Sequence, residues 1–180
     1  MYDYQRIIDK YYPAGSPLRD IYMRHCRSVA NLALDIARRK GLDLSPADIE
    51  AAAMLHDIGI VRTDAPGIHC HGSEPYLAHG RIGADLLRAE GAPEEYARVA
   101  ERHTGAGLTP EDVARMSPML PPDRSYMPQT LLERLVCYAD KFYSKSGDMK
   151  IKPLERVRAS LTKFGEGASE RFERLHQEFG

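Results

Sequence analysis

Two adjacent residues of this chain, His56 and Asp57, carry side chains that could bind one metal ion together. They follow an apolar run, and Gly59 comes two residues later, where a helix would end. Neighbouring residues on a helix point about 100° apart, so they rarely reach the same small target. A bound cation is a target that both can reach, because an imidazole nitrogen and a carboxylate oxygen approach it from different angles. The doublet therefore predicts a metal centre to which other parts of the chain contribute.

Four further residues with metal-binding side chains fall on apolar stripes of other predicted helices. They are His25, His79, His103 and Asp140. A single histidine on an apolar face is more often a hydrogen-bonded core residue than a ligand. Burying four imidazoles and two carboxylates in one core without a counter-charge is costly, however, and one or two divalent cations would supply that charge. Imidazole and carboxylate without thiolate suit Fe, Mn, Co, Ni or Zn in a catalytic site rather than a structural one.

The segments that carry these residues are predicted to be helices. Proline and serine signals start them, and glycines such as Gly41 and Gly91 stop them. The predicted helices cover 2–12, 17–40, 46–56, 76–90, 93–103, 109–116, 130–144, 153–164 and 168–179. Segment 60–75 is predicted to be a long loop beside the site, and 117–128, with four prolines, a surface excursion. No stretch alternates like a strand, so the predicted fold class is all-α, a helical bundle with the metal centre in its core.

Length and composition set further bounds. The 180 residues fit a single domain, with a core over about 18–146 and C-terminal helices over 151–179 packed on it. A net charge of −1 argues against a nucleic-acid polymer or a membrane surface as partner. No apolar run approaches the roughly 20 residues of a membrane span, and the N-terminus does not resemble a signal peptide. Three cysteines without a CxxC pattern fit a reducing compartment, so the predicted location is the cytoplasm.

Other charged residues allow two interpretations. Three cations close to ligand positions could hold phosphate oxygens, although a solvated surface explains them equally well; they are Lys141, Arg81 and Lys145. His69 and His71 are expected to be exposed loop residues, and the charges of the last two helices are expected to form an ordinary amphipathic surface.

The pattern of ligands resembles the HD-domain superfamily of metal-dependent phosphohydrolases, in particular its HDIG subset. The resemblance rests on His25, the His56-Asp57-Ile58-Gly59 string and Asp140, and it covers roughly 18–146. His79 and His103 look like the additional ligands of HD proteins that hold two metals, including symmetrical diadenosine tetraphosphate hydrolases and HD-GYP phosphodiesterases. The paired histidines of the HD-GYP group are missing here. The sequence is most similar to small archaeal and bacterial HDIG proteins of unassigned substrate.

The resemblance implies an HD helical bundle and an enzyme of the hydrolase class. In it, His25, His56, Asp57 and Asp140 would bind one metal, and Asp57 would bridge to a second ion held by His79 and His103. A metal-bound hydroxide would cleave a phosphate ester or anhydride, with His56 and Asp57 as the catalytic residues. The expected partner is a small phosphorylated molecule, above all a nucleotide or dinucleotide, and a homodimer is left open. Two alternatives remain: a di-iron HD-fold oxygenase and a non-catalytic nucleotide-binding sensor.

Overall fold

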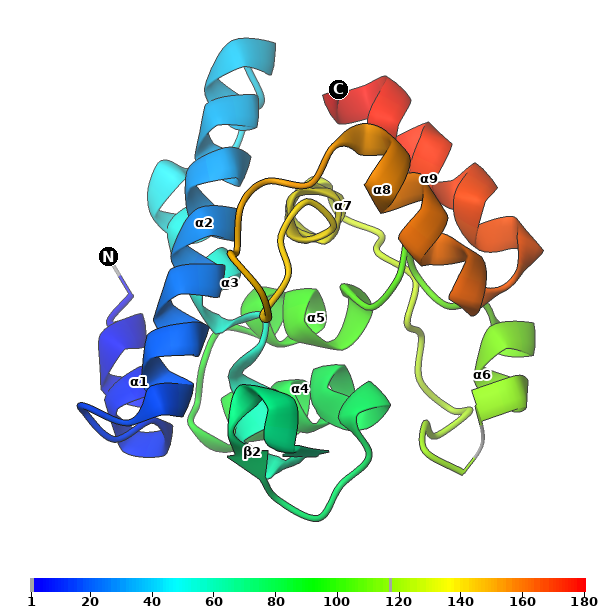
Figure 1. The fold of residues 1–180 in the computed structure, drawn as a ribbon. Coiled ribbons are helices and arrows are strands. Elements are labelled where there is room, and N and C mark those ends of the chain that lie inside the picture. Colours follow the sequence, from blue (N-terminus) through cyan, green and yellow to red (C-terminus); the bar gives the residue numbers. More distant parts are fainter. Residues whose placement is uncertain (1, 117) are drawn as a thin grey trace.

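The computed structural model describes residues 2–116 and 118–180, and helices make up most of this part of the chain (Figure 1). The α-helices are α1 (Tyr4–Tyr11), α2 (Pro17–Lys40), α3 (Pro46–Leu55), α4 (His79–Ala89), α5 (Glu94–Arg102), α6 (Pro110–Met116), α7 (Leu131–Asp140), α8 (Leu154–Leu161) and α9 (Glu166–Phe179). Short 3-10 helices are η1 (Ile58–Arg62), η2 (Pro66–Ile68), η3 (Tyr76–Ala78) and η4 (Thr162–Phe164). The predicted all-α class is confirmed.

The boundaries of the long helices follow the sequence signals. The Ser16 side chain accepts a hydrogen bond from the backbone N–H of Arg19, and Pro17 occupies the first turn of α2. Gly41 ends this helix in the left-handed conformation, with φ of 63°. Ser45 caps α3 in the same way as Ser16 caps α2. These local signals fix where α2 and α3 begin, and therefore where along each helix His25 and His56 meet the core.

Two segments differ from the prediction. The 60–75 loop contains a two-stranded antiparallel sheet, β1 (Asp64–Ala65) with β2 (Cys70–His71), which is too short to show alternation in sequence. Helix α7 ends at Asp140 instead of continuing to Ser144. The backbone N–H groups of Phe142 and Tyr143 bond to carbonyls three residues back, so the chain turns away immediately after the aspartate. Of the predicted 117–128 excursion, residue 117 lies outside the described residues.

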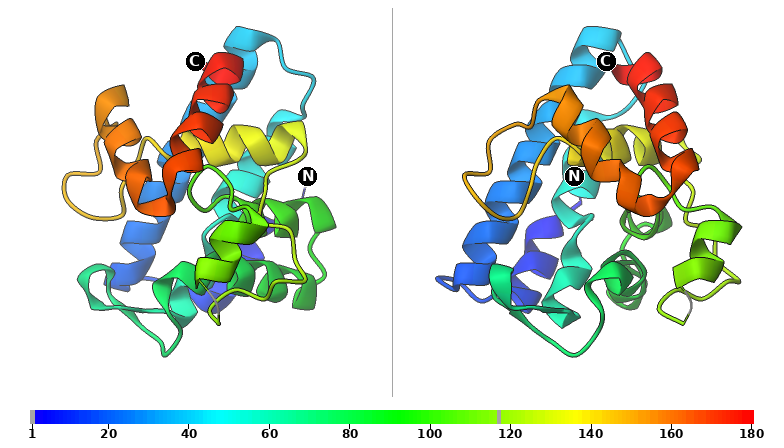
Figure 2. Two further views of the ribbon diagram at one scale, coloured as in Figure 1. Left: turned by 90° about the vertical axis from the view of Figure 1, so that its right-hand side faces the viewer. Right: turned by 45° about the vertical axis from the view of Figure 1, so that its right-hand side comes forward.

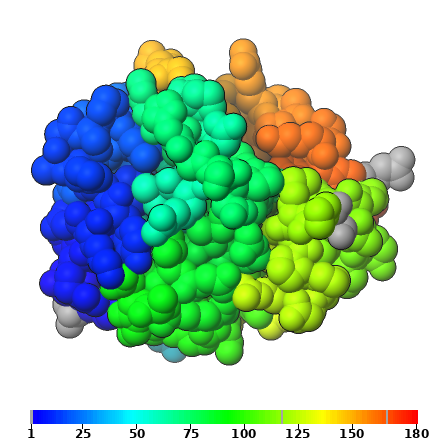
Figure 3. All heavy atoms as spheres, turned by 90° about the horizontal axis from the view of Figure 1, so that it is seen from below, coloured from blue at the N-terminus to red at the C-terminus, as the bar shows by residue number. Residues whose placement is uncertain are grey.

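Helix α7 lies near the middle of the molecule and is seen end-on in Figure 1, with α2 on one side and α9 on the other. Helices α3 and α5 also pack on α7, and α8 lies beside α9 (Figure 2). The face seen from below is shared by segments far apart in the chain, namely the N-terminal residues, the α3–α4 connection and the α6–α7 segment (Figure 3). The assignment of all 180 residues to one domain stays a prediction.

A close backbone contact joins η1 to α4. A Cβ atom at Gly59 would collide with the carbonyl oxygen of His79 and the backbone of Gly83, and one at Gly83 would lie 3.2 Å from the Gly59 nitrogen. The pair of glycines therefore lets the start of α4 approach the His56-Asp57 doublet. None of the helices in the described part of the chain is long and apolar enough to cross a membrane.

Candidate metal centre

Side chains from five helical segments meet in the core, and all of them are 0–8% exposed. They are His25, His56, Asp57, His79, His103 and Asp140, the residues that the sequence predicted as metal ligands. Most of them stand at helix ends. His56 follows the last residue of α3, His103 follows α5, His79 begins α4 and Asp140 ends α7. At a helix end the next residue is free to leave the helical path, which explains how the adjacent His56 and Asp57 reach one centre.

The first group of ligand atoms consists of His25, His56, Asp57 and Asp140. The Nε2 atom of His25 lies 3.1 Å from Asp57 Oδ2 and 3.0 Å from Asp140 Oδ1. The Nε2 atom of His56 lies 3.1 Å and 3.4 Å from the same two oxygens. Two imidazole nitrogens and two carboxylate oxygens thus surround one point.

The second group consists of Asp57, His79 and His103. Here the other carboxylate oxygen, Asp57 Oδ1, lies 3.5 Å from His79 Nε2 and 3.3 Å from His103 Nε2. The two Nε2 atoms are 3.0 Å apart. Asp57 therefore stands between the groups, with one oxygen facing each.

Backbone hydrogen bonds fix the orientation of three imidazoles. The Nδ1 atoms of His56, His79 and His103 donate to carbonyl oxygens three residues earlier, at 2.6–2.7 Å. Because a carbonyl only accepts, Nδ1 of each ring carries a proton, and Nε2 of a neutral ring presents a lone pair to the centre. Burial, together with His103, lowers the pKa of His79 to about 3, and burial also lowers the pKa of His103. At His56 burial opposes a charge, but Asp57 raises the pKa of this ring well above its usual range. Two lone pairs 3.0 Å apart cannot satisfy each other, whereas a cation satisfies both.

The remaining polar atoms fit the same interpretation. Both nitrogens of His25, His56 Nε2 and both oxygens of Asp57 are buried without a well-aligned hydrogen bond from any described residue. Ligand atoms about 2.0–2.2 Å from one ion stand roughly 3 Å from each other, which matches the separations in both groups. The residues therefore fit a centre of one or two divalent cations, the number and kind of ion that the sequence suggested.

The predicted phosphate-binding cations have different surroundings. Lys145 Nζ lies 2.6 Å from Asp57 Oδ2, and although burial opposes a charge there, Asp57 raises the pKa of this lysine well above its usual range. Lys141 Nζ lies 2.6 Å from Asp140 Oδ2 and donates to the His103 carbonyl oxygen at 2.9 Å.

Arg81 lies outside this arrangement. Its guanidinium faces Glu74 and Asp85 at 3.6 Å and 3.7 Å. It lines a separate hollow, which also includes the exposed His71. The structure therefore does not bring Arg81 to the ligand groups. Arg81 lies in the first turn of α4, two residues after His79. Its side chain nevertheless lies on another face of the helix.

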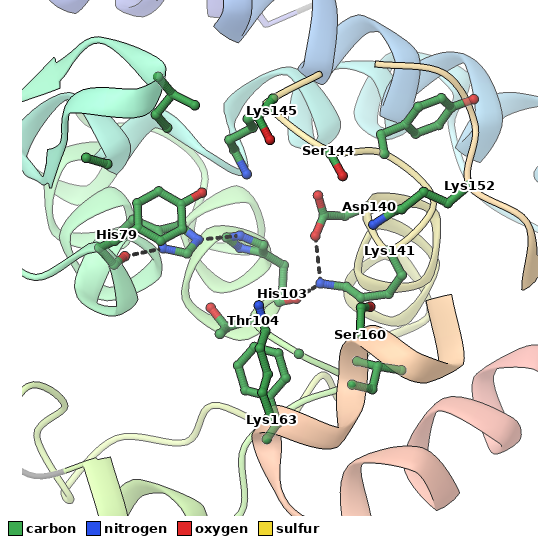
Figure 4. A pocket seen from close by; sticks show the side chains of 18 of the residues that line it. His79, His103, Thr104, Asp140, Lys141, Ser144, Lys145, Lys152, Ser160 and Lys163 are labelled. Atoms are coloured by element: carbon green, nitrogen blue, oxygen red, sulfur yellow. Dashed lines mark hydrogen bonds and ion pairs between the residues drawn. The ribbon is translucent and has the colours of Figure 1, made fainter. Parts of the chain in front are cut away.

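A cavity of about 630 Å³ opens beside the second group. His79, His103 and Asp140 form part of its wall, together with Lys141 and Lys145 (Figure 4). Another part of the wall comes from the C-terminal segment, which contributes Lys152, Arg156, Ser160 and Lys163. Arg156 and Lys163 are exposed, as expected for the charges of the last two helices, but they also line this cavity. The spacing of Arg156, Ser160 and Lys163 by four and three residues is a signal for a shared helix face that the sequence contained.

Fold and site define an all-α protein with a buried histidine and aspartate centre beside a cationic cavity. Residues 22–144 match the HD domain family, so the chain belongs to this family. This membership confirms the predicted family.

Three relatives extend the comparison. A tRNA (cytidine(56)-2'-O)-methyltransferase of Thermoplasma volcanium is 36% identical over 97% of this chain and 46% of its own length. A protein with the same description from Picrophilus torridus is 30% identical over 88% of this chain and 41% of its own length. An uncharacterised protein of Methanocaldococcus jannaschii is 38% identical over 66% of this chain and 63% of its own length. The chain thus spans less than half of each methyltransferase.

One solved structure has the same fold. The HD domain of the L. monocytogenes phosphodiesterase PgpH superimposes with a TM-score of 0.56 and covers 99% of this chain and 96% of that domain, at 15% sequence identity. At this identity the likeness concerns the fold. It agrees with the helical bundle that the sequence predicted.

Proposed function

We propose that this protein hydrolyses a phosphate ester or anhydride of a small molecule, with a nucleotide or dinucleotide as the expected substrate, at a centre of two divalent metal ions. The proposed ligands are His25, His56, Asp57 and Asp140 for one ion, and Asp57, His79 and His103 for the other. The observation that carries the proposal is the position of Asp57, whose two oxygens face two separate groups of ligand atoms.

The metal ligands and the two nearby lysines have different proposed roles. Metal ions bound there would lower the pKa of a water molecule towards neutrality and polarise a phosphoryl oxygen. The backbone hydrogen bonds of His56, His79 and His103 hold the three rings in the binding tautomer. Lys145 and Lys141 stand at the edge of the centre, where their ammonium groups can stabilise negative charge on phosphate oxygens.

The cavity favours an anionic, phosphorylated ligand. Among the described residues, its wall contains five cationic side chains and a single carboxylate. An oxygenase or a sensor with an anionic ligand would have the same wall, so the assay without oxygen and the recovery of nucleotide distinguish the three functions. The methyltransferase activity in the descriptions of two relatives does not apply to this chain by similarity alone, because more than half of each relative lies outside the match.

The test begins with elemental analysis of freshly purified protein. About two equivalents of Fe, Mn, Co, Ni or Zn per chain are expected, since this ligand set accepts several divalent ions. The metal-loaded protein is then incubated without oxygen with nucleotides and dinucleoside polyphosphates, and phosphate release is followed. Turnover with Mn or Co under these conditions supports hydrolysis. Oxygen consumption coupled to substrate loss, or recovery of every nucleotide unchanged, contradicts it.

A further inference from the structure

We infer that the cavity contains a second anion-binding subsite, built by Lys152, Arg156 and Lys163, for a phosphate group other than the one at the metal centre. The inference rests on the proposed hydrolase function and narrows its substrate to molecules that carry at least two phosphate groups. These three residues lie beyond residue 144, where the match to the HD domain family ends. The subsite is therefore a property of this chain's C-terminal segment rather than of the matched region.

The first support is the placement of the three cations. All of them line the same cavity as His79, His103 and Asp140. Lys152 lies just before α8, Arg156 lies in its first turns, and Lys163 lies in η4 directly after it. Figure 4 shows Lys152 beside Asp140 and Lys141, and Lys163 below His103 and Thr104. A ligand in the cavity thus meets the C-terminal cations next to the metal-binding groups.

The second support is unbalanced charge. The whole chain has a net charge of −1, yet five cations and one carboxylate line this cavity. Lys141 and Lys145 face Asp140 and Asp57 directly. By contrast, no carboxylate of a described side chain lies within 4.0 Å of the charged atoms of Lys152 or Arg156. A concentration of one sign of charge in a cleft attracts ligands of the opposite sign.

Three other arginines of this region are paired with carboxylates. Arg158 contacts Glu173 at 2.7 Å, Arg171 contacts Asp112 at 2.7 Å and Arg134 contacts Glu178 at 2.8 Å. Each of these arginines forms an ion pair with a carboxylate on a neighbouring helix. Arg156 is on the same helix as Arg158, two residues away, and instead faces the cavity. Arg156 is thus placed where a ligand in the cavity reaches its guanidinium group.

The surroundings of Lys152 agree with this. Burial lowers the pKa of its ammonium group; Asp140 opposes the effect, and Lys141, Lys145 and Lys163 add to it. Like charges crowded in this way are relieved by a bound anion. Ser144, Ser146 and Ser160 line the same cavity and offer hydroxyl donors to phosphate oxygens.

The test uses isothermal titration calorimetry of the metal-loaded protein with inorganic triphosphate and with orthophosphate. Triphosphate is expected to bind at least about tenfold more tightly, because additional charge-assisted hydrogen bonds from the C-terminal cations would hold the phosphate groups that orthophosphate lacks. Arg156→Gln and Lys152→Gln should each weaken triphosphate binding on the order of tenfold and change orthophosphate binding by less than about threefold. Elemental analysis after each titration verifies that triphosphate has not removed the metal.

Arg158→Gln is the matched control, since it removes the same charge from the same helix but outside the cavity. It should leave triphosphate affinity unchanged within about twofold. Equal affinity for the two anions, or an equal loss in Arg156→Gln and Arg158→Gln, would overturn the subsite. The proposed hydrolase function is decided separately by metal content and phosphate release. Triphosphate selectivity without turnover would support the subsite and refute the hydrolase. Turnover without triphosphate selectivity would support the hydrolase and refute the subsite.

Discussion

The two groups of proposed ligands share Asp57 but differ in their access to the cavity. In the first group, His25 and His56 are 1% and 0% exposed and do not line the cavity; Asp140 alone reaches its wall. In the second group, both His79 and His103 form part of the wall. An ion in the first group would be enclosed by α2, α3 and α7, whereas one in the second would face an incoming substrate. Two sites built from the same residue types can therefore differ in their access to substrate because of their positions alone.

The groups also differ in charge. The first combines two carboxylates with two imidazoles, and the second combines one carboxylate oxygen with two imidazoles of lowered pKa. A divalent cation is attracted more strongly by two carboxylates than by one. We therefore expect the first group to keep its ion when the second loses its own.

The largest expected effect comes from Asp57→Asn, which weakens both groups at once. The variant is expected to contain no metal above background and to release phosphate more than about a hundredfold more slowly, since even residues behind a ligand change affinity or activity 10–100-fold. Elemental analysis and phosphate release check this, with circular dichroism as the control for folding. A variant that retains both ions would contradict the bridging role of Asp57.

The next prediction separates the two groups. His103→Ala should keep about one equivalent of metal, because His25, His56, Asp57 and Asp140 are intact, whereas His25→Ala should lose the more tightly held ion. The comparison is made by elemental analysis of both variants after the same dialysis. Retention of two equivalents in His103→Ala would remove His103 from the ligand set.

A smaller effect concerns the pH dependence of the metal-free protein. Burial lowers the pKa of His79 to about 3 in the folded state, compared with 6.5 ordinarily. The unfolded chain therefore binds this proton at higher pH, and the free energy of unfolding should fall as pH drops from about 6.5 towards 3.

Urea unfolding of the metal-free protein at pH 7 and pH 5 measures this dependence. His79→Gln should reduce the change in the free energy of unfolding between pH 7 and pH 5 by at most about 2 kcal/mol. An identical slope in the wild-type protein and the variant would show that His79 does not contribute.

The smallest effect is expected for Arg81→Gln. Arg81 was predicted to bind substrate, but it faces Glu74 and Asp85 in a separate hollow. The substitution should change kcat/KM by less than about twofold, because Arg81 lines the separate hollow rather than the cavity and its ion pairs are long. Lys145→Gln is the matched comparison, since Lys145 contacts Asp57 and lines the cavity, and it should lower phosphate release clearly. A large loss in Arg81→Gln would restore the predicted substrate role.

Much of the centre could be predicted from sequence because its residues obey local rules. His25 lies on the apolar stripe of a long helix whose ends are set by Ser16-Pro17 and Gly41. His103 and Asp140 lie on similar stripes, and periodicity alone assigns each of them to a buried face. The helical class, the ligand residue types and the exposed positions of His69 and His71 follow from such local patterns.

Other features required the folded chain. The sequence could not separate Lys145, which contacts Asp57, from Arg81, which points to another hollow, since both lie within a few residues of a ligand. It also could not show that α7 stops at Asp140 and that the following turn carries Lys141 and Lys145 over the centre. Predicted cytoplasmic location, a homodimer and a nucleotide substrate stay predictions.

By itself, the sequence determined the helices and which of their faces turn inward, because capping and periodicity depend on neighbours within a few residues. Only the tertiary structure decided that Asp57 presents one oxygen to each ligand group, and that the C-terminal cations line the same cavity as His79 and His103. The physical reason is that these relations depend on packing between helices distant in the chain, such as α9 on α7 and α4 on η1 through Gly59 and Gly83. Local propensities do not encode such distances.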